Sequence, residues 1–211
     1  LVEELLRARP NFSFLLEEGG SIEGTDSSNC WIIDPLDGTT NFLHGIPHFS
    51  ISIGLKRDDK MYAGVIYDPL RDEIFWAELG LGAFVNSKRL RVSSRKDLSD
   101  ALIGTGMPYK DRANHPEYPE MLELVTQQVA GVRRFGSAAL DLAYVAAGRY
   151  DGFWEFSLSP WDIAAGLIIL SEAGAISTEI NGDNQMLSTG DVLATNGKLH
   201  KDMLNLLSQI K

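Results

Sequence analysis

Cysteine is almost absent from this 211-residue chain, because Cys30 is its single example. One thiol cannot form an intramolecular disulfide, which excludes the class of small secreted domains that disulfides stabilise. Its neighbours Asn29 and Trp31 predict the start of a buried strand rather than a reactive thiol. We therefore expect a protein of a reducing compartment and predict a cytoplasmic location.

Long hydrophobic runs are also missing, and no segment approaches the roughly 20 apolar residues that span a bilayer. The N-terminal stretch Leu-Val-Glu-Glu-Leu-Leu-Arg-Ala-Arg has neither the basic start nor the continuous apolar core of a secretion signal. We expect neither a membrane partner nor export. Because the chain starts inside a helical pattern without Met, we also expect that it lacks upstream residues, in particular N-terminal helices.

Positive charge is scarce, since 19 Lys and Arg residues face 29 Asp and Glu residues, for a net charge of −10. A surface for a phosphate backbone needs clustered Lys and Arg, so nucleic acid is not expected as a direct ligand. An acidic protein can still bind an anionic substrate where a metal ion reverses the local field. On charge alone, cation binding and simple solubility explain the acidity equally well.

The chain contains enough apolar residues, 44% of the total, for a continuous core, and we expect one domain over residues 1–211 with subdomains at roughly 1–100 and 101–211. β-rich runs predict strands at 12–16, 30–33, 51–55, 61–67, 73–78, 83–85, 101–105, 132–135, 152–156, 175–179 and 192–195, with a loop at 19–29. Helical spacing predicts helices at 1–9, 118–129, 138–147, 163–173 and 199–210. Because strands and helices do not alternate strictly, a layered α/β (α+β) arrangement with two sheets is favoured over a Rossmann fold.

The most informative segment is Trp-Ile-Ile-Asp-Pro-Leu-Asp-Gly-Thr-Thr-Asn-Phe, which begins at Trp31. Its apolar strand delivers Asp34 and Asp37, three residues apart across a stiff proline, and the backbone carbonyl of Leu36 lies between them. Carboxylate and carbonyl oxygens are the ligands that hard cations such as Mg²⁺ require. Taken singly, an Asx turn at Asp34 and a helix N-cap at Asp37 are simpler explanations. The combination favours a metal site.

The residues after these carboxylates suggest a second element of the same site. If a helix begins at Gly38 and Thr39, its free amides and dipole would accept a phosphate group beside the metal. Gly38 would also let the backbone approach that phosphate closely. The sequence thus places an anion site next to a cation site.

A second motif, Trp-Asp-Ile-Ala-Ala-Gly, begins at Trp161 and places Asp162 at the head of an apolar helix. The alternative interpretation is again an ordinary N-cap. The small residues that follow, at 164–166, permit close backbone packing, so this helix start could lie deep enough for Asp162 to join the other carboxylates.

In these two motifs the chain resembles the inositol monophosphatase family, whose patterns are Asp-Pro-Ile/Leu-Asp-Gly-Thr and Trp-Asp-x-Ala-Ala/Gly-Gly. The resemblance extends through Glu17-Glu18, Gly136-Ser137-Ala138-Ala139 and Glu155, and so covers the chain from about residue 12. It implies an αβαβα sandwich and a homodimer. It also implies hydrolysis of a small polyol's phosphate monoester, such as myo-inositol monophosphate, by a Mg²⁺-dependent, Li⁺-sensitive mechanism.

Carried over residue by residue, the resemblance implies two to three Mg²⁺ ions per site, held by Glu17, Asp34, the Leu36 carbonyl, Asp37 and Asp162. It gives catalytic roles to Thr39, Glu17 and Asp37, with the Thr39 hydroxyl bonded to a carboxylate while it positions or deprotonates the attacking water. Substrate-binding roles fall to Gly38, Thr39, Ala138, Glu155 and Asp162. The chain departs from the family pattern at Leu16, where the family has Gly before its Glu-Glu pair, and in lacking most of an N-terminal helical pair.

Two alternatives to this function remain open. Proteins with the same motifs act on fructose 1,6-bisphosphate, histidinol phosphate or adenosine 3′,5′-bisphosphate, so the substrate is less well defined than the reaction. A bacterial branch of the family associates with the transcription machinery, so a regulatory protein that binds such a partner is a second hypothesis.

Other conspicuous residues have simpler interpretations. His44 and His48 follow the first motif, but no Cys or further His accompanies them, and a surface or turn role is expected. Arg133 and Arg134 could attract an anionic substrate, although a solvated pair is favoured, because neighbours on a strand point to opposite faces. Gly-Leu-Gly at 80–82 predicts a hairpin turn rather than a nucleotide loop.

Overall fold

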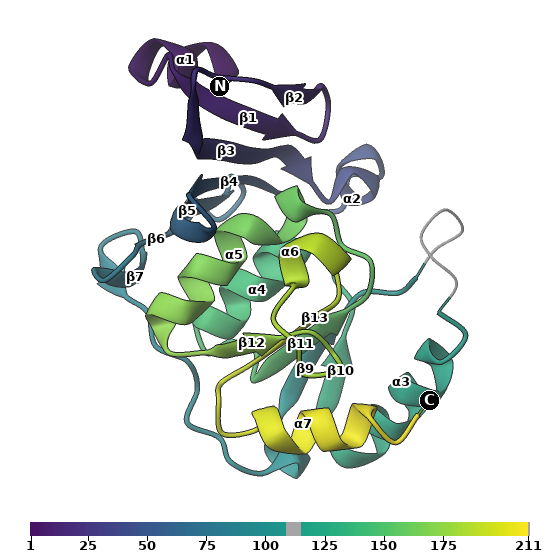
Figure 1. Cartoon of the computed structure of the whole chain (residues 1–211). Coiled ribbons are helices and arrows are strands. Elements are labelled where there is room, and N and C mark those ends of the chain that lie inside the picture. The colour runs from purple at the N-terminus through teal and green to yellow at the C-terminus, as the bar shows by residue number, and fades with distance from the viewer. Residues whose placement is uncertain (109–114, 211) are drawn as a thin grey trace.

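The computed structural model describes residues 1–108 and 115–210 and has two β-sheets separated by helices (Figure 1). The first sheet has the order β2-β1-β3-β4-β5-β6-β7-β8, and among its described strands only β1 and β3 pair in parallel. Its strands are β1 (Phe12–Leu16), β2 (Gly20–Ile22), β3 (Asp26–Asp37), β4 (Ser50–Arg57), β5 (Lys60–Asp68), β6 (Glu73–Glu78), β7 (Gly82–Val85) and β8 (Lys88–Arg89).

The second sheet has the order β10-β9-β11-β13-β12. Its strands are β9 (Leu102–Thr105), β10 (Gly131–Arg133), β11 (Gly152–Glu155), β12 (Ile176–Thr178) and β13 (Val192–Thr195). β9 pairs in parallel with β10 and β11, whereas β13 is antiparallel to both of its neighbours. The mixed sheets agree with the α/β class expected from the sequence.

The helices form layers between and outside the sheets (Figure 1). Two of them, α4 (Ala138–Ala146) and α5 (Pro160–Ala173), lie between the sheets, while α3 (Tyr118–Gln128) and α7 (His200–Leu207) cover the outer face of the second sheet. Over the described residues, the outer side of the first sheet carries only α1 (Val2–Ala8), which buries no residue. The short elements α2 (Thr39–Leu43), η1 (Leu98–Asp100) and α6 (Met186–Thr189) complete the chain.

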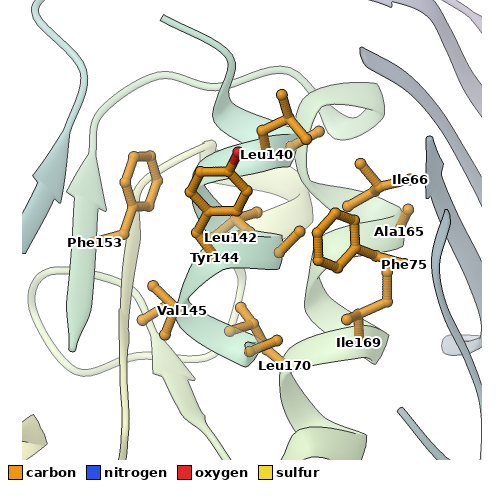
Figure 2. Packing of buried hydrophobic residues seen from close by; sticks show 14 of the residues in the cluster. Ile66, Phe75, Leu140, Leu142, Tyr144, Val145, Phe153, Ala165, Ile169 and Leu170 are labelled. Atoms are coloured by element: carbon orange, nitrogen blue, oxygen red, sulfur yellow. The ribbon is translucent and has the colours of Figure 1, made fainter. Parts of the chain in front are cut away.

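The main core lies between the two sheets, around α4 and α5 (Figure 2). Every residue of α4 is buried, since one face of this helix packs on the second sheet and another on α5. Figure 2 shows Phe75 of the first sheet and Phe153 of the second on opposite sides of these helices, with Leu142 and Leu170 among the side chains between. Burial on all sides explains why these helices are apolar around most of their circumference.

Helix α5 approaches the first sheet closely because small residues meet there. A Cβ atom on Gly54 would lie 2.9 Å from the Cβ of Ala164, and one on Gly64 would lie 2.7 Å from the Ala165 carbonyl oxygen. The close backbone packing that the sequence predicted for 164–166 is therefore confirmed.

Replacing Gly64 with alanine is expected to destabilise the protein by about 2 kcal/mol, because the new methyl group would collide with the backbone of α5 at Ala165 and with the branched side chain of Ile168. Thermal unfolding should then show a melting temperature roughly 4–8 °C lower. Gly131→Ala is the matched control, since the nearest atom there is the mobile end of Arg133 at 3.2 Å. An unchanged melting temperature for Gly64→Ala would contradict this packing argument.

Most expected elements are present, but three predictions about the chain's course are wrong. The expected loop at 19–29 contains β2, which forms a hairpin with β1, and the first residues of β3, which pair with β1 and β4. The strand predicted at 30–33 continues to Asp37. Helix α5 begins at Pro160 rather than at Ile163. β8 and α6 were not predicted, and the single-domain expectation stays a prediction.

Two smaller findings concern loops and helices. The Gly-Leu-Gly segment at 80–82 connects the antiparallel strands β6 and β7, which confirms the expected hairpin turn. Within residues 1–108 and 115–210, each helix is too short or too polar to cross a lipid bilayer.

Candidate active site

A bulge in β3 brings the first two carboxylates to one face. Asp34 lies opposite Ser52 of β4, and Asp37 lies opposite Ser50, so the three-residue step in β3 faces a two-residue step in β4. Side chains of a regular strand alternate between faces, and residues three apart would point in opposite directions. The extra residue restores the same direction, which is why Asp34 and Asp37 are both buried on one side.

A third carboxylate, Asp162, joins this pair from the start of α5. Asp34, Asp37 and Asp162 each offer an oxygen atom, and these atoms all lie within 4.8 Å of one another. All three residues are buried, with exposed fractions of 2%, 8% and 5%. Such a set of hard oxygen ligands could hold a metal ion.

Asp37 is held in place by the start of α4. Its Oδ2 accepts hydrogen bonds from the Ser137 hydroxyl at 2.5 Å and from the Ala139 amide at 2.9 Å. A free backbone amide of this helix start therefore binds a carboxylate of the protein itself. Because two donors fix one oxygen, the other is left to face the carboxylate cluster.

Asp162 is the third residue of α5 and not its N-cap, which is Ser159. The Ser159 amide donates to Asp162 Oδ2 at 2.8 Å, as in a capping box. The N-cap interpretation of Asp162 is therefore wrong, although its side chain does bind the helix start, and the expected approach of Asp162 to the other carboxylates is confirmed.

Burial and mutual repulsion perturb the two β3 carboxylates. Burial, followed by the charge of Asp37 and a hydrogen bond with Glu17, raises the pKa of Asp34 to about 8. Burial also raises the pKa of Asp37 to about 7, with a contribution from Asp162, although the Ser137 hydrogen bond acts in the opposite direction. Three carboxylates so close together cannot all ionise at low cost without a cation.

The three carboxylates line a cleft of about 590 Å³. All residues that the sequence assigned to the site line this cleft, namely Glu17, Asp34, Leu36, Asp37, Gly38, Thr39, Ala138, Glu155 and Asp162. They come from the ends of β1, β3 and β11 and from the starts of α2, α4 and α5. The fold therefore brings together segments that are more than a hundred residues apart.

Glu17 and Thr39 are exposed, unlike the three buried carboxylates. Glu17 follows β1, is exposed, and is close enough to Asp34 to share a hydrogen bond. The Thr39 hydroxyl donates to the Leu36 carbonyl at 3.0 Å, whereas the expected partner was a carboxylate. Thr39 thus contacts the very carbonyl that the resemblance names as a metal ligand.

A helix does begin where the sequence indicated, with Gly38 as the N-cap of α2. Gly38 has a φ of 90°, and a Cβ atom there would lie 3.1 Å from the His48 carbonyl oxygen and 3.2 Å from that of Gly136. Any other residue would be strained by conformation and by space. Asn41, in the middle of α2, ties this helix to its neighbours, since its side-chain amide donates to the Phe135 and His48 carbonyls.

Sequence reasoning missed several residues of the cleft. Arg133 and Arg134 are both exposed, as expected of a solvated pair, and Arg134, which lies beyond the end of β10, also lines the cleft. Because β10 ends at Arg133, the expectation that Arg133 and Arg134 point to opposite faces of one strand does not apply. Gly106 and Leu158 also line the cleft, and no sequence signal marked them.

The two histidines have different environments. His44 is exposed, and its Nδ1 is 2.8 Å from the Thr40 carbonyl oxygen, as expected for a turn residue. His48 is buried between Phe135 and Tyr144, which contradicts the expected surface role. Burial lowers the pKa of His48 to about 4, so it is neutral at physiological pH.

The model of the inositol monophosphatase family matches residues 1–211 of the chain. An inositol-1-monophosphatase of Rhizobium meliloti is 53% identical over 207 residues, which cover 98% of this chain and 78% of that protein. A Nus factor SuhB of Pseudomonas aeruginosa is 47% identical over 211 residues, with 98% and 78% coverage. The crystal structure of the extragenic suppressor protein suhB from Bartonella henselae has a TM-score of 0.95 at 50% identity, covering 99% of this chain and 81% of that one.

The match of the family model over the whole chain and the high identity to inositol-1-monophosphatases agree with the cleft and its acidic cluster. The chain therefore belongs to the inositol monophosphatase family and is a phosphatase.

Proposed function

We propose that this phosphatase hydrolyses a phosphate monoester of a small polyol, with myo-inositol monophosphate as substrate and Mg²⁺ as cofactor. The observation that carries the proposal is the buried acidic group of Asp34, Asp37 and Asp162 beside the glycine-led turn at Gly38. Relatives named inositol-1-monophosphatase support the choice of substrate.

The residues fit a hard divalent cation. Their buried carboxylates have raised pKa values, which a bound cation would lower, and oxygen is the ligand that Mg²⁺ prefers. We assign two to three Mg²⁺ ions to Glu17, Asp34, the Leu36 carbonyl, Asp37 and Asp162, with Glu17 reaching the group from the end of β1. When bound, such ions supply an activated water and neutralise charge on the phosphate and the leaving oxygen.

The chain's own residues complete the site. The amides of Gly38 and Thr39 bind the phosphate oxygens, because α2 leaves its first N–H groups free of intrahelical partners. The Thr39 hydroxyl donates a hydrogen bond to the Leu36 carbonyl and so turns a lone pair toward the attacking water. Water attacks phosphorus in line, and the polyol oxygen leaves with a proton. No phosphoenzyme forms.

The part of the cleft around Glu155 binds the polyol. Glu155 accepts hydrogen bonds from two hydroxyl groups, Asp162 faces a third, and Ala138 presents a small apolar surface. Li⁺ inhibits by occupying part of the cation site.

Phosphate release from a panel of monoesters tests the proposal. We expect turnover of inositol monophosphate that requires Mg²⁺, stops with EDTA and is inhibited by Li⁺. The panel includes fructose 1,6-bisphosphate, histidinol phosphate and adenosine 3′,5′-bisphosphate, so preference for any of them would correct the substrate but keep the reaction. Absence of turnover with every monoester would refute the function.

We also propose a cytoplasmic homodimer. The single cysteine supports a reducing compartment, and the exposed apolar side chains of Phe42, Leu43 and Ile46 support an interface on this side of the molecule. Sedimentation should give a dimer at micromolar concentration, and a monomer under those conditions would contradict it.

A regulatory role is the second candidate, because a relative at 47% identity is named Nus factor SuhB. Under this hypothesis the protein binds a component of the transcription machinery, independently of catalysis. The Asp37→Asn variant separates the two functions, since it should lose hydrolysis and keep partner binding. Loss of both together would argue against a separate regulatory surface.

A further inference from the structure

We infer that Gly106 is a specificity-determining residue for the polyol, because the Glu155 carboxyl group occupies the space that any side chain at position 106 would need. The inference rests on the proposed function, which assigns Glu155 to the substrate's hydroxyl groups. Both residues line the cleft and come from the second sheet, whereas Asp34 and Asp37 come from the first.

The contact follows from the parallel pairing of β9 and β11. Trp154 lies opposite Thr105, so the next residues, Glu155 and Gly106, lie side by side at the same edge of the sheet. A Cβ atom on Gly106 would lie 1.9 Å from the Glu155 carboxyl carbon and 2.0 and 2.1 Å from its oxygens. These distances are far inside van der Waals contact, so the carboxyl group lies directly against the glycine.

The backbone of β11 cannot yield to relieve such a clash. β11 is an interior strand, with β9 on one side and β13 on the other, and Glu155 itself pairs with Val192. Beyond Glu155, the Ser157 amide donates to Asp191 Oδ1 at 3.0 Å, and the Ser157 hydroxyl is 2.9 Å from His115 Nε2. A side chain at position 106 would therefore displace the Glu155 side chain and leave the strand in place.

The fixed carboxylate selects a class of substrate. It accepts hydrogen bonds and donates none when ionised, so it binds monoesters whose alcohol carries free hydroxyl groups. An ester whose alcohol has no hydroxyl group gains nothing from Glu155. Gly106 thus acts on the polyol and not on the phosphate.

The test compares Gly106→Ala with wild type on inositol monophosphate and on p-nitrophenyl phosphate, whose leaving group has no free hydroxyl. We expect KM for inositol monophosphate to rise by about tenfold or more, the loss typical of a charged hydrogen bond. The kcat and KM values for p-nitrophenyl phosphate and the inhibition by inorganic phosphate should stay unchanged. Gly131→Ala, at an edge strand outside the cleft, is the control and should match wild type on both substrates.

Two double variants show whether the effect passes through Glu155. Gly106→Ala should add nothing further to Glu155→Gln, because both changes remove the same contact. Adding Glu155→Asp to Gly106→Ala should partly restore KM for inositol monophosphate, because the shorter side chain of aspartate leaves room for the new methyl group. Equal losses on both ester substrates, or additive losses in the Glu155→Gln background, would overturn the inference.

Failure of the proposed function has a different result. The wild-type protein itself would then release phosphate from neither substrate. Failure of the inference leaves wild-type turnover intact and appears only in the variants, as an unchanged KM of Gly106→Ala for inositol monophosphate, equal losses on both esters, or additive losses with Glu155→Gln.

Discussion

The Asp37→Asn variant is expected to lose at least ~10³-fold in kcat/KM for inositol monophosphate, which corresponds to about 4 kcal/mol of transition-state stabilisation. Asparagine keeps the shape of the side chain and can still accept from the Ser137 hydroxyl and the Ala139 amide. It loses the negative charge that the cation site requires. Steady-state kinetics at saturating Mg²⁺ would measure the effect.

Stability measurements distinguish this loss from misfolding. Burial raises the pKa of Asp37 to about 7, so its ionised form is unfavourable without a cation, and Asp37→Asn should melt no lower than wild type in EDTA at pH 8. Asp59→Asn, in the exposed turn between β4 and β5, is the matched control and should retain full activity. If Asp37→Asn kept activity within about tenfold, a margin of only ~1.4 kcal/mol, Asp37 would not be a metal ligand.

The local elements of the fold were largely predictable, because hydrophobic periodicity reflects which face of a strand or helix is buried. The start of α5 was misplaced although the sequence contains a signal for it. Ser159, Pro160 and Asp162 form the pattern of a capping box with Pro at the first helical position. A search for that pattern would have placed the helix start correctly.

The geometry of the site depended on information that the sequence does not display locally. Asp34 and Asp37 share a face only because β3 bulges against β4, and pairing between distant strands sets that bulge. Glu155 rests on Gly106 for a similar reason, since β9 and β11 are neighbours only in the folded sheet. Residue types could indicate a metal site, but strand pairing decided how its ligands and its substrate wall are arranged.

His48 was misjudged because it was assigned from its polarity, whereas its position depends on what packs beside it. It is enclosed by aromatic rings from α4 and from the segment before it. Arg134 is exposed as expected, and it lines the cleft because β10 ends at Arg133 instead of continuing to Phe135. Polarity predicts exposure only where no tertiary contact overrides it.

The metal-free protein is expected to lose stability as the pH rises from 6.5 to 8. The pKa values of Asp37 and Asp34, about 7 and about 8, lie above the value of about 4 for an unfolded chain. Between these limits the folded protein retains protons that the unfolded chain has released, so the free energy of unfolding falls with rising pH. Buried Asp141, whose pKa is also raised, acts in the same direction.

The window starts at pH 6.5 because His48 acts in the opposite sense below it. Its lowered pKa, about 4, makes the folded state more stable as the pH rises toward the unfolded value of about 6.5, after which its contribution is constant. From pH 6.5 to 8 the carboxylates dominate, and we expect the melting temperature in EDTA to fall by roughly 5 °C, corresponding to about 2 kcal/mol.

Mg²⁺ should reverse this trend, because it binds ionised carboxylates and therefore competes with protons. The rise in melting temperature on adding saturating Mg²⁺ is expected to be larger at pH 8 than at pH 6.5, and to be lost in Asp37→Asn. Thermal unfolding at both pH values, with Mg²⁺ and with EDTA, measures all of these terms in one series. An equal Mg²⁺ effect at both pH values would mean that the acidic cluster is already ionised without a cation, contrary to the burial of Asp34 and Asp37.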